Sequence, residues 1–160
     1  MDHQCGACSA CCTTTWVPEL RKPGYQPCAH QHGGCAIYPQ RPQSCRDFQC
    51  YWLAHPELSE RLRPDRCGVV IEELDVPSRA VLVMVNPSTP FRWKVPPASE
   101  MIEAFVANNR PVCLTGPPGF PPILRLPLGR NEDEVWAELT AAARRWVRDV
   151  EPAATTGVRH

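Results

Sequence analysis

The sequence lacks an excess of charge of either sign and lacks any long apolar run. Seventeen Lys and Arg side chains balance 17 Asp and Glu side chains in 160 residues. This balance argues against a nucleic-acid partner, because phosphate binding usually needs a basic excess. No apolar run approaches the roughly 20 residues that a transmembrane helix needs, so no membrane span is expected.

The first residues lack the basic and apolar segments of a secretory signal. The chain begins Met1-Asp2-His3-Gln4-Cys5, in which no apolar stretch follows a positive charge. A sequence without such a signal is expected in the cytoplasm, where thiols stay reduced.

Recognised catalytic motifs are also absent from the sequence. It contains no P-loop, no G-x-S-x-G element and no dinucleotide-binding fingerprint. The zinc-deaminase signature, H-x-E followed by P-C-x2-C, is missing as well. Whether the protein is an enzyme therefore stays open, and an oxidoreductase would require an iron–sulfur cluster.

Cysteine is abundant but very unevenly distributed. Only Cys67 and Cys113 follow Tyr51, and eight of the ten cysteines precede it: Cys5, Cys8, Cys11, Cys12, Cys28, Cys35, Cys45 and Cys50. In a secreted domain such density would indicate a disulfide framework. In a reducing compartment it favours metal ligation by thiolates, with disulfides as the alternative.

The first four cysteines have the spacing C-x2-C-x2-C-C. A C-x2-C turn brings two thiolates to one ion, and the small residues Gly6 and Ala7 permit a tight turn. Cys11 and Cys12 are adjacent, so their side chains point apart and one ion rarely accepts both without strain. We expect these two cysteines to serve different metal ions, or different irons of one cluster.

The later cysteines surround two histidines and two arginines. His30 follows Cys28 by two residues and is a possible ligand, as is His32, although their spacing alone is weak evidence. Eight cysteines match two four-thiolate sites in number. Arg41 and Arg46 would offset the negative charge of such sites if they lie beside the sulfurs.

Taken together, these elements resemble the YkgJ-type cysteine-cluster family. The resemblance rests on Cys5 to Cys12 and on the pattern C-x-I-Y-x2-R-P-x2-C-R-x-F-x-C, which runs from Cys35 to Cys50. Bacterial members are described as zinc- or iron-chelating proteins. The resemblance implies metal binding by all eight clustered cysteines but names no reaction. Some relatives have a further cysteine where this sequence has Gln31.

Zinc and iron both suit thiolate ligands, so ligand type alone does not separate them. Cys5, Cys8 and Cys11 match part of a bacterial ferredoxin run, but its x3-C-P continuation is absent. The sequence favours Zn²⁺ in a structural, interaction or metal-handling role. The alternative is an iron–sulfur cluster with a redox or electron-transfer role. Metal ions are the expected partners, and no protein partner is indicated.

The chain is expected to divide into a cysteine-rich metal-binding module over 1–54, an α+β part over 55–150 and a disordered tail over 151–160. In the α+β part, strands are expected at 68–74, 80–85, 111–115 and 122–126, the first two forming an antiparallel hairpin. Helices are expected at 56–62, from Ser99 and from Asn131 to Val150. Met101, Ile102, Phe105, Val106, Leu139 and Trp146 are expected to be buried. Cys113 should be a core thiol, and Cys67 a core thiol or a ninth ligand.

Overall fold

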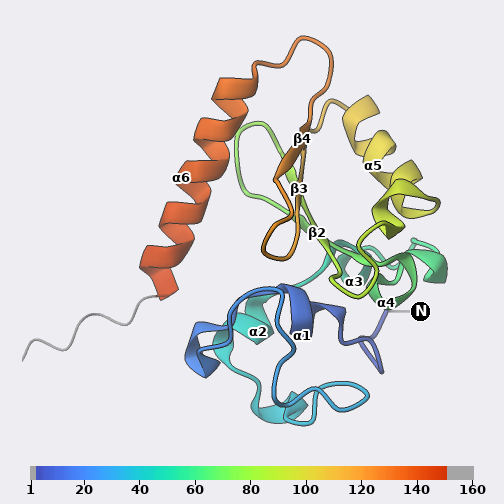
Figure 1. The fold of residues 1–160 in the computed structure, drawn as a ribbon, viewed down its shortest axis with the longest axis vertical. Coiled ribbons are helices and arrows are strands. Elements are labelled where there is room, and N and C mark those ends of the chain that lie inside the picture. The colour runs from blue at the N-terminus through green and yellow to red at the C-terminus, as the bar shows by residue number, and fades with distance from the viewer. Residues whose placement is uncertain (1–2, 151–160) are drawn as a thin grey trace, which may run out of the picture.

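The fold is α+β, as the sequence predicts, with helices around a four-stranded sheet (Figure 1). The structure is a computed structural model that describes residues 3–150, with side chains through Arg144. The predicted tail over 151–160 lies outside the described residues. Among those residues, no helix is long and apolar enough to cross a membrane.

The sheet is mixed, and its strands follow the order of the chain. They are β1 (Val69–Glu73), β2 (Val81–Val85), β3 (Val112–Thr115) and β4 (Ile123–Arg125). β1 and β2 form the predicted antiparallel hairpin. β3 and β4 also pair in antiparallel fashion, and the segment from Gly116 to Gly119 contains the turn between them. β2 and β3 pair in parallel, which requires the crossover through α5 (Ala98–Ala107).

Helix α5 covers one face of the sheet. Its buried residues Ala98, Ile102 and Phe105 pack in a single core with strand residues such as Val83 and Leu114. Ser99 was expected to be the N-cap, but the N-cap is Pro97 and Ser99 lies within the helix. Met101 and Val106 were expected to be buried but are only partly so, because they lie at the margins of this core.

The opposite face of the sheet carries the cysteine-rich module. Alternation along the strands turns Val70 of β1 and Met84 of β2 toward Ala10 of α1 (Ala10–Thr14). Tyr25 from the module reaches the same sheet, where its hydroxyl lies 2.6 Å from Thr115 Oγ1 of β3. The sheet therefore shares a core with the module, which on its own has few apolar side chains.

The module contains short helices and no strand. After α1 come η1 (Pro18–Leu20), η2 (Tyr38–Gln40), α2 (Gln43–Asp47) and α3 (Tyr51–Ala54). Within residues 3–54 the β pairing is limited to two isolated bridges, Val17 with Lys22 and Gln31 with Cys35. Turns and side-chain contacts must therefore hold the loops together.

The predicted helix over 56–62 is wrong. The chain forms turns there, and only η3 (Glu60–Leu62) is helical. The Ser59 hydroxyl accepts a hydrogen bond from the Arg61 N–H, so the helix begins after Ser59 instead of at Pro56. Two further short helices, α4 (Pro64–Cys67) and η4 (Arg92–Lys94), precede β1 and α5.

The last helix, α6 (Glu132–Val150), lies on the opposite side of the sheet from α5 (Figure 1). Its start is as predicted, because Asn131 Oδ1 accepts the Glu134 N–H at 3.1 Å. Val135 is buried, but Leu139 is only partly buried, which corrects the expected burial; the Trp146 side chain lies outside the described residues. Glu138 holds the β1–β2 loop by accepting the Ser78 N–H at 2.9 Å.

Candidate metal centre

All ten cysteines lie in the described part of the chain, and none forms a disulfide. The eight in the module are partly buried, whereas Cys67 and Cys113 are buried. The free thiols leave the metal-ligand hypothesis open and do not support a disulfide framework.

The first C-x2-C element forms the tight turn expected from the sequence. The Cys8 N–H donates to the Cys5 carbonyl at 2.8 Å. Gly6 lies in this turn at φ +52°, a conformation that favours glycine. The charge of Cys5 raises the pKa of Cys8, although burial of Cys8 is the larger cause.

Three cysteine sulfurs accept a hydrogen bond from the backbone two residues further along the chain. The His30 N–H lies 3.5 Å from Cys28 Sγ, Ala10 donates in the same way to Cys8, and Cys50 accepts from Leu53 as well as from Trp52. An N–H directed at sulfur favours the thiolate over the neutral thiol. Each of these local turns is therefore suited to present a thiolate ligand.

One group of thiols lies against the sheet. We define the first thiol set as Cys5, Cys8, Cys11 and Cys50. Cys5 and Cys8 are the thiols whose charges act on Cys50, and both also act on Cys11. Cys8, Cys11 and Cys50 pack against the core of Ala10, Val70 and Met84. Burial raises the pKa of Cys50 to about 11, so without a positive partner this thiol stays neutral.

A second group of thiols is not among the side chains packed against the core of Ala10, Val70 and Met84. We define the second thiol set as Cys12, Cys28, Cys35 and Cys45. The last of these, Cys45, is influenced by the charges of the other three. A backbone hydrogen bond of 3.0 Å from the Cys28 N–H to the Cys12 carbonyl ties two members together.

Cys11 and Cys12 join the two sets through the backbone. Their thiols hydrogen-bond to each other, so the expectation that these adjacent side chains point apart is wrong. The hydrogen bond holds the pKa of Cys11 well above its ordinary value and lowers that of Cys12 to about 7. Cys12 is thus the partly ionised member of the pair at neutral pH. Cys12 also acts on Cys5 of the first set, so the two sets adjoin each other at this point.

A buried lysine lies beside the second thiol set, and the sequence analysis did not identify it. The Lys22 residue is 6% exposed, and its ammonium donates to the carbonyls of Thr13, Thr15 and Pro23. Burial lowers the Lys22 pKa, whereas the charges of Cys28, Cys12, Cys11 and Cys45 oppose that shift. Among the described residues, no carboxylate forms an ion pair with Lys22. The four ionisable groups whose charges act most on it are cysteine thiols.

Three other side chains contact or influence the first thiol set. Arg41 lies close enough to lower the pKa of Cys5, whose burial raises it, and the Tyr38 hydroxyl is a hydrogen-bond partner of the same thiol. Arg41 also stacks on the Tyr38 ring, 3.7 Å from its centroid. Asp65 hydrogen-bonds to Cys8. Arg41 thus acts on a cysteine sulfur, as the sequence analysis expects. Arg46 instead donates to the Arg41 carbonyl.

The side chains do not already form a finished metal site. In residues 3–150, no group of three or more His, Cys, Asp and Glu side chains has an arrangement that could hold an ion. His30 contributes its backbone N–H to Cys28, and its side chain joins no such group. His32 is exposed. The donors nevertheless suit zinc or iron chemically, since two adjoining sets of four thiols are what two four-thiolate ions require.

The two remaining cysteines belong to the core. The Cys67 thiol donates to the carbonyls of Leu62 and Val69, at 3.3 and 3.4 Å, and burial raises its pKa to about 11. Burial likewise raises the pKa of Cys113 to about 11. Both are thus small core side chains, as predicted for Cys113, and Cys67 has the weaker case as a ligand.

Replacing a core cysteine should leave the metal content unchanged. Cys113→Ala and Cys67→Ala remove one sulfur each from the apolar core, which we expect to lower the free energy of unfolding by about 1 kcal/mol. The ratio of metal to protein should equal that of the parent protein by elemental analysis. A loss of metal in Cys67→Ala would make this residue a ninth ligand.

No family model matches the chain, and the searches found no matching curated protein or solved structure. The resemblance to the YkgJ-type family thus stays a hypothesis that rests on the cysteine motifs.

Proposed function

We propose that the cysteine-rich module binds two metal ions, one at each thiol set, and that zinc is the preferred metal. The role that we propose for each ion follows from the position of the thiol set that binds it. The first set packs on the sheet and would stabilise the joint core, whereas the second set holds loops together and is available for metal handling. The grouping of the thiols and the buried Lys22 ammonium support this proposal, and measurement of the metal content tests it.

The observation that carries the proposal is the Lys22 ammonium. Burying a positive charge is unfavourable unless a negative group compensates for it. The groups that act on Lys22 are thiols of both sets, and they compensate only when ionised. A four-thiolate zinc site has a formal excess of two negative charges, which a buried ammonium would offset. Lys22 therefore suits a second thiol set that is ionised and bound to metal.

The main alternative is an iron–sulfur cluster on the same cysteines. It would give the protein a redox or electron-transfer role and would use N–H donors to sulfur in a similar way. Four cysteines also hold an iron–sulfur cluster, so the ligand count does not decide between the metals. We prefer zinc because it needs no assembly machinery and suits a closed structural site.

Metal uptake should release protons. Burial raises the pKa of Cys5, Cys8, Cys45 and Cys50, so these thiols are protonated in the metal-free protein at neutral pH. Binding requires the thiolates and should release up to about four protons per ion, with fewer at the second set because Cys12 is already partly ionised. Zinc affinity should then fall as the pH is lowered, since protons and metal compete for the same sulfurs. Titration of zinc into metal-free protein in weak buffers at two pH values measures both effects.

Anaerobic purification distinguishes zinc from iron. Elemental analysis should give about two zinc ions per chain and a protein without visible absorption. A brown protein that contains iron and acid-labile sulfide would favour the alternative. Protein that is folded and free of both metals, and that takes up neither, would contradict metal binding altogether.

A further inference from the structure

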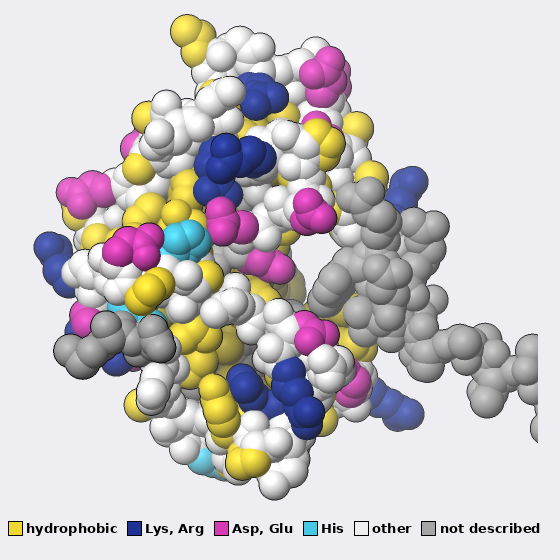
Figure 2. Space-filling model, turned by 180° about the vertical axis from the view of Figure 1, so that it is seen from behind, with side chains coloured by type: hydrophobic (Ala, Val, Ile, Leu, Met, Phe, Trp, Pro, Cys, Tyr) yellow, Lys and Arg dark blue, Asp and Glu magenta, His cyan; other side chains and the backbone are white. Residues whose placement is uncertain are grey.

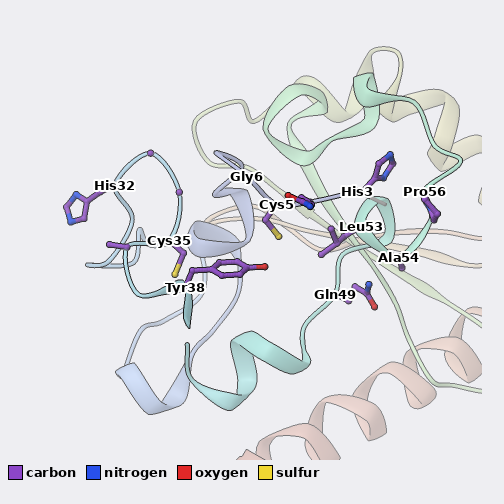
Figure 3. A pocket seen from close by; sticks show the side chains of 14 residues that line it. His3, Cys5, Gly6, His32, Cys35, Tyr38, Gln49, Leu53, Ala54 and Pro56 are labelled. Atoms are coloured by element: carbon purple, nitrogen blue, oxygen red, sulfur yellow. The ribbon is translucent and has the colours of Figure 1, made fainter. Parts of the chain in front are cut away.

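An open groove lies at the surface of the cysteine-rich module (Figure 3). It has a volume of about 920 Å³ and is formed by parts of three segments, residues 3–6, 32–38 and 49–56. Sites for small ligands usually have volumes of about 300–1,000 Å³. The groove is therefore large enough for a ligand of a few amino-acid residues.

Direct contacts hold the three segments of the groove together. The His3 ring stacks on the Trp52 ring at 3.8 Å between centroids, and its Nδ1 lies 2.7 Å from the Trp52 carbonyl oxygen. Gly34 packs on Gly6 so closely that a Cβ at Gly34 would lie 3.1 Å from the Gly6 carbonyl oxygen. Walls that are fixed in this way need little ordering when a ligand binds, which favours affinity.

Two carboxamides from different segments provide hydrogen-bonding groups in the groove. Gln4 and Gln49 both line it, and no hydrogen bond joins either side chain to another described residue. A carboxamide offers a donor and an acceptor, which is the combination that a peptide group also offers. A peptide repeats this combination along its length, so one short chain can bond to both side chains.

An exposed aromatic ring provides apolar surface in the same groove. Tyr38 is 49% exposed, and in Figure 3 its ring extends toward Leu53 and Gln49 on the other side of the groove. The Arg41 guanidinium stacks 3.7 Å from the centroid of this ring, and its Nε donates to the Tyr38 carbonyl at 3.1 Å. Tyr38 is therefore held in a position from which it can contact a ligand side chain.

The lining of the groove is uncharged apart from histidine. Of the described residues that form it, none is Asp, Glu, Lys or Arg, and Arg41 lies against Tyr38 without joining the lining. A charged ligand would lose hydration in the groove without gaining an ion pair with its walls. The walls thus favour a ligand whose side chains are uncharged.

We propose that the groove binds a short peptide segment with uncharged side chains. The carboxamides of Gln4 and Gln49 hydrogen-bond to the backbone amide groups of the peptide, while Tyr38 and Leu53 contact its side chains. This inference goes beyond the proposed function, and it gives no role to a metal ion or to the cysteines that line the groove.

The test uses the full chain and three capped tripeptides at about pH 8, where histidine side chains are ordinarily neutral. The probes are N-acetyl-Ala-Gln-Ala amide and its analogues with Glu or Lys in place of Gln. The Gln peptide should bind roughly three- to tenfold more tightly than either analogue, because only the analogues carry a charge that the groove partly desolvates. Equal or tighter binding of the Glu peptide, which has almost the same shape, would overturn the proposal.

NMR spectra of the backbone amides locate the binding site. The Gln peptide should shift resonances of residues 3–6, 32–38 and 49–56 and leave those of α5 unchanged. Ala54→Trp and Ala36→Trp place a ring at exposed positions of the lining and should lose most of the binding. Ala107→Trp, at an exposed position on α5 outside the lining, is the matched control and should bind like the parent protein.

Gln49→Glu tests the uncharged wall without changing its shape. The variant should bind the Lys peptide more tightly than the Glu peptide, because the new carboxylate attracts one and repels the other. Identical affinities of the two charged peptides in this variant, or full binding in both tryptophan variants, would place the peptide elsewhere and overturn the proposal.

Two further outcomes separate this inference from its alternatives. Binding of N-acetylglutamine methylamide as tightly as the tripeptide would overturn it, because the ligand would then be a small amide instead of a chain. Protein that contains no metal but binds the Gln peptide in the groove would support this inference while contradicting the proposed function.

Discussion

Cys11→Ser and Cys12→Ser are each expected to lose one metal ion, and not the same one. The charges of Cys5 and Cys8 act on Cys11, whereas Cys12 acts on Cys45 and lies among the members of the second set. A serine in place of a thiolate removes one of four ligands from one ion and leaves the other ion complete. Each variant should therefore keep about one ion per chain under mild chelation.

Cadmium-113 substitution shows which ion is lost. The parent protein should give two resonances, of which Cys11→Ser removes one and Cys12→Ser the other. Cys11→Ser should lower the free energy of unfolding more than Cys12→Ser does, because Cys11 packs on Val70 and Met84 of the sheet. The double variant should leave the module unfolded while the α+β part keeps some structure.

Cys113→Ala is the control for this experiment, since it removes a thiol that lies in the sheet. Two single variants that keep the full complement with parental affinity would show that neither cysteine is a required ligand. Loss of the same resonance in both variants would mean that the adjacent cysteines share an ion.

Lys22→Met is expected to weaken the ion at the second thiol set by about 10- to 100-fold, a range typical when a group that supports metal ligands is removed. The substitution deletes the buried positive charge that would offset the ionised sulfurs. The first set should be affected less, because Cys11 is its one member among the four thiols whose charges act most on Lys22.

Unfolding experiments distinguish this electrostatic role from a merely structural one. Loss of Lys22 leaves the carbonyls of Thr13, Thr15 and Pro23 without a donor in both metal-free and metal-loaded protein. That cost is common to both forms, whereas loss of the charge acts on the metal-loaded form. The decrease in the free energy of unfolding should thus be larger with metal than without it.

Lys94→Met is the matched control. Lys94 is the second of the two lysines in the chain and is exposed, with its ammonium above the rings of Phe91 and Trp93. It should leave metal affinity unchanged. An equal loss of stability in the two forms of Lys22→Met would assign Lys22 to loop structure alone.

Charged side chains are distributed over the surface without clear separation by sign on the side seen in Figure 2. The expectation of no nucleic-acid partner, based on the balanced composition, stays a prediction. Cytoplasmic location likewise stays a prediction from the first residues of the sequence.

Local patterns were sufficient to predict several elements. The β1–β2 hairpin, the start of α6 at Asn131 and the tight Cys5–Cys8 turn each depend on residues close together in the chain. The helix expected at Pro56 failed for an equally local reason, because Ser59 provides the stronger N-cap. The partial burial of Leu139 could not be predicted in this way, since it depends on how closely α6 approaches the sheet.

The sequence by itself determined the α+β class, the hairpin and the concentration of eight thiols in one module, because spacing and periodicity act over a few residues. Only the tertiary structure decided which thiols lie together. It also placed Cys8, Cys11 and Cys50 against the sheet, and it buried Lys22 beside sulfurs that are distant in sequence. The physical reason is that burial and electrostatic interaction depend on distance in space, which loops without a regular period do not reveal.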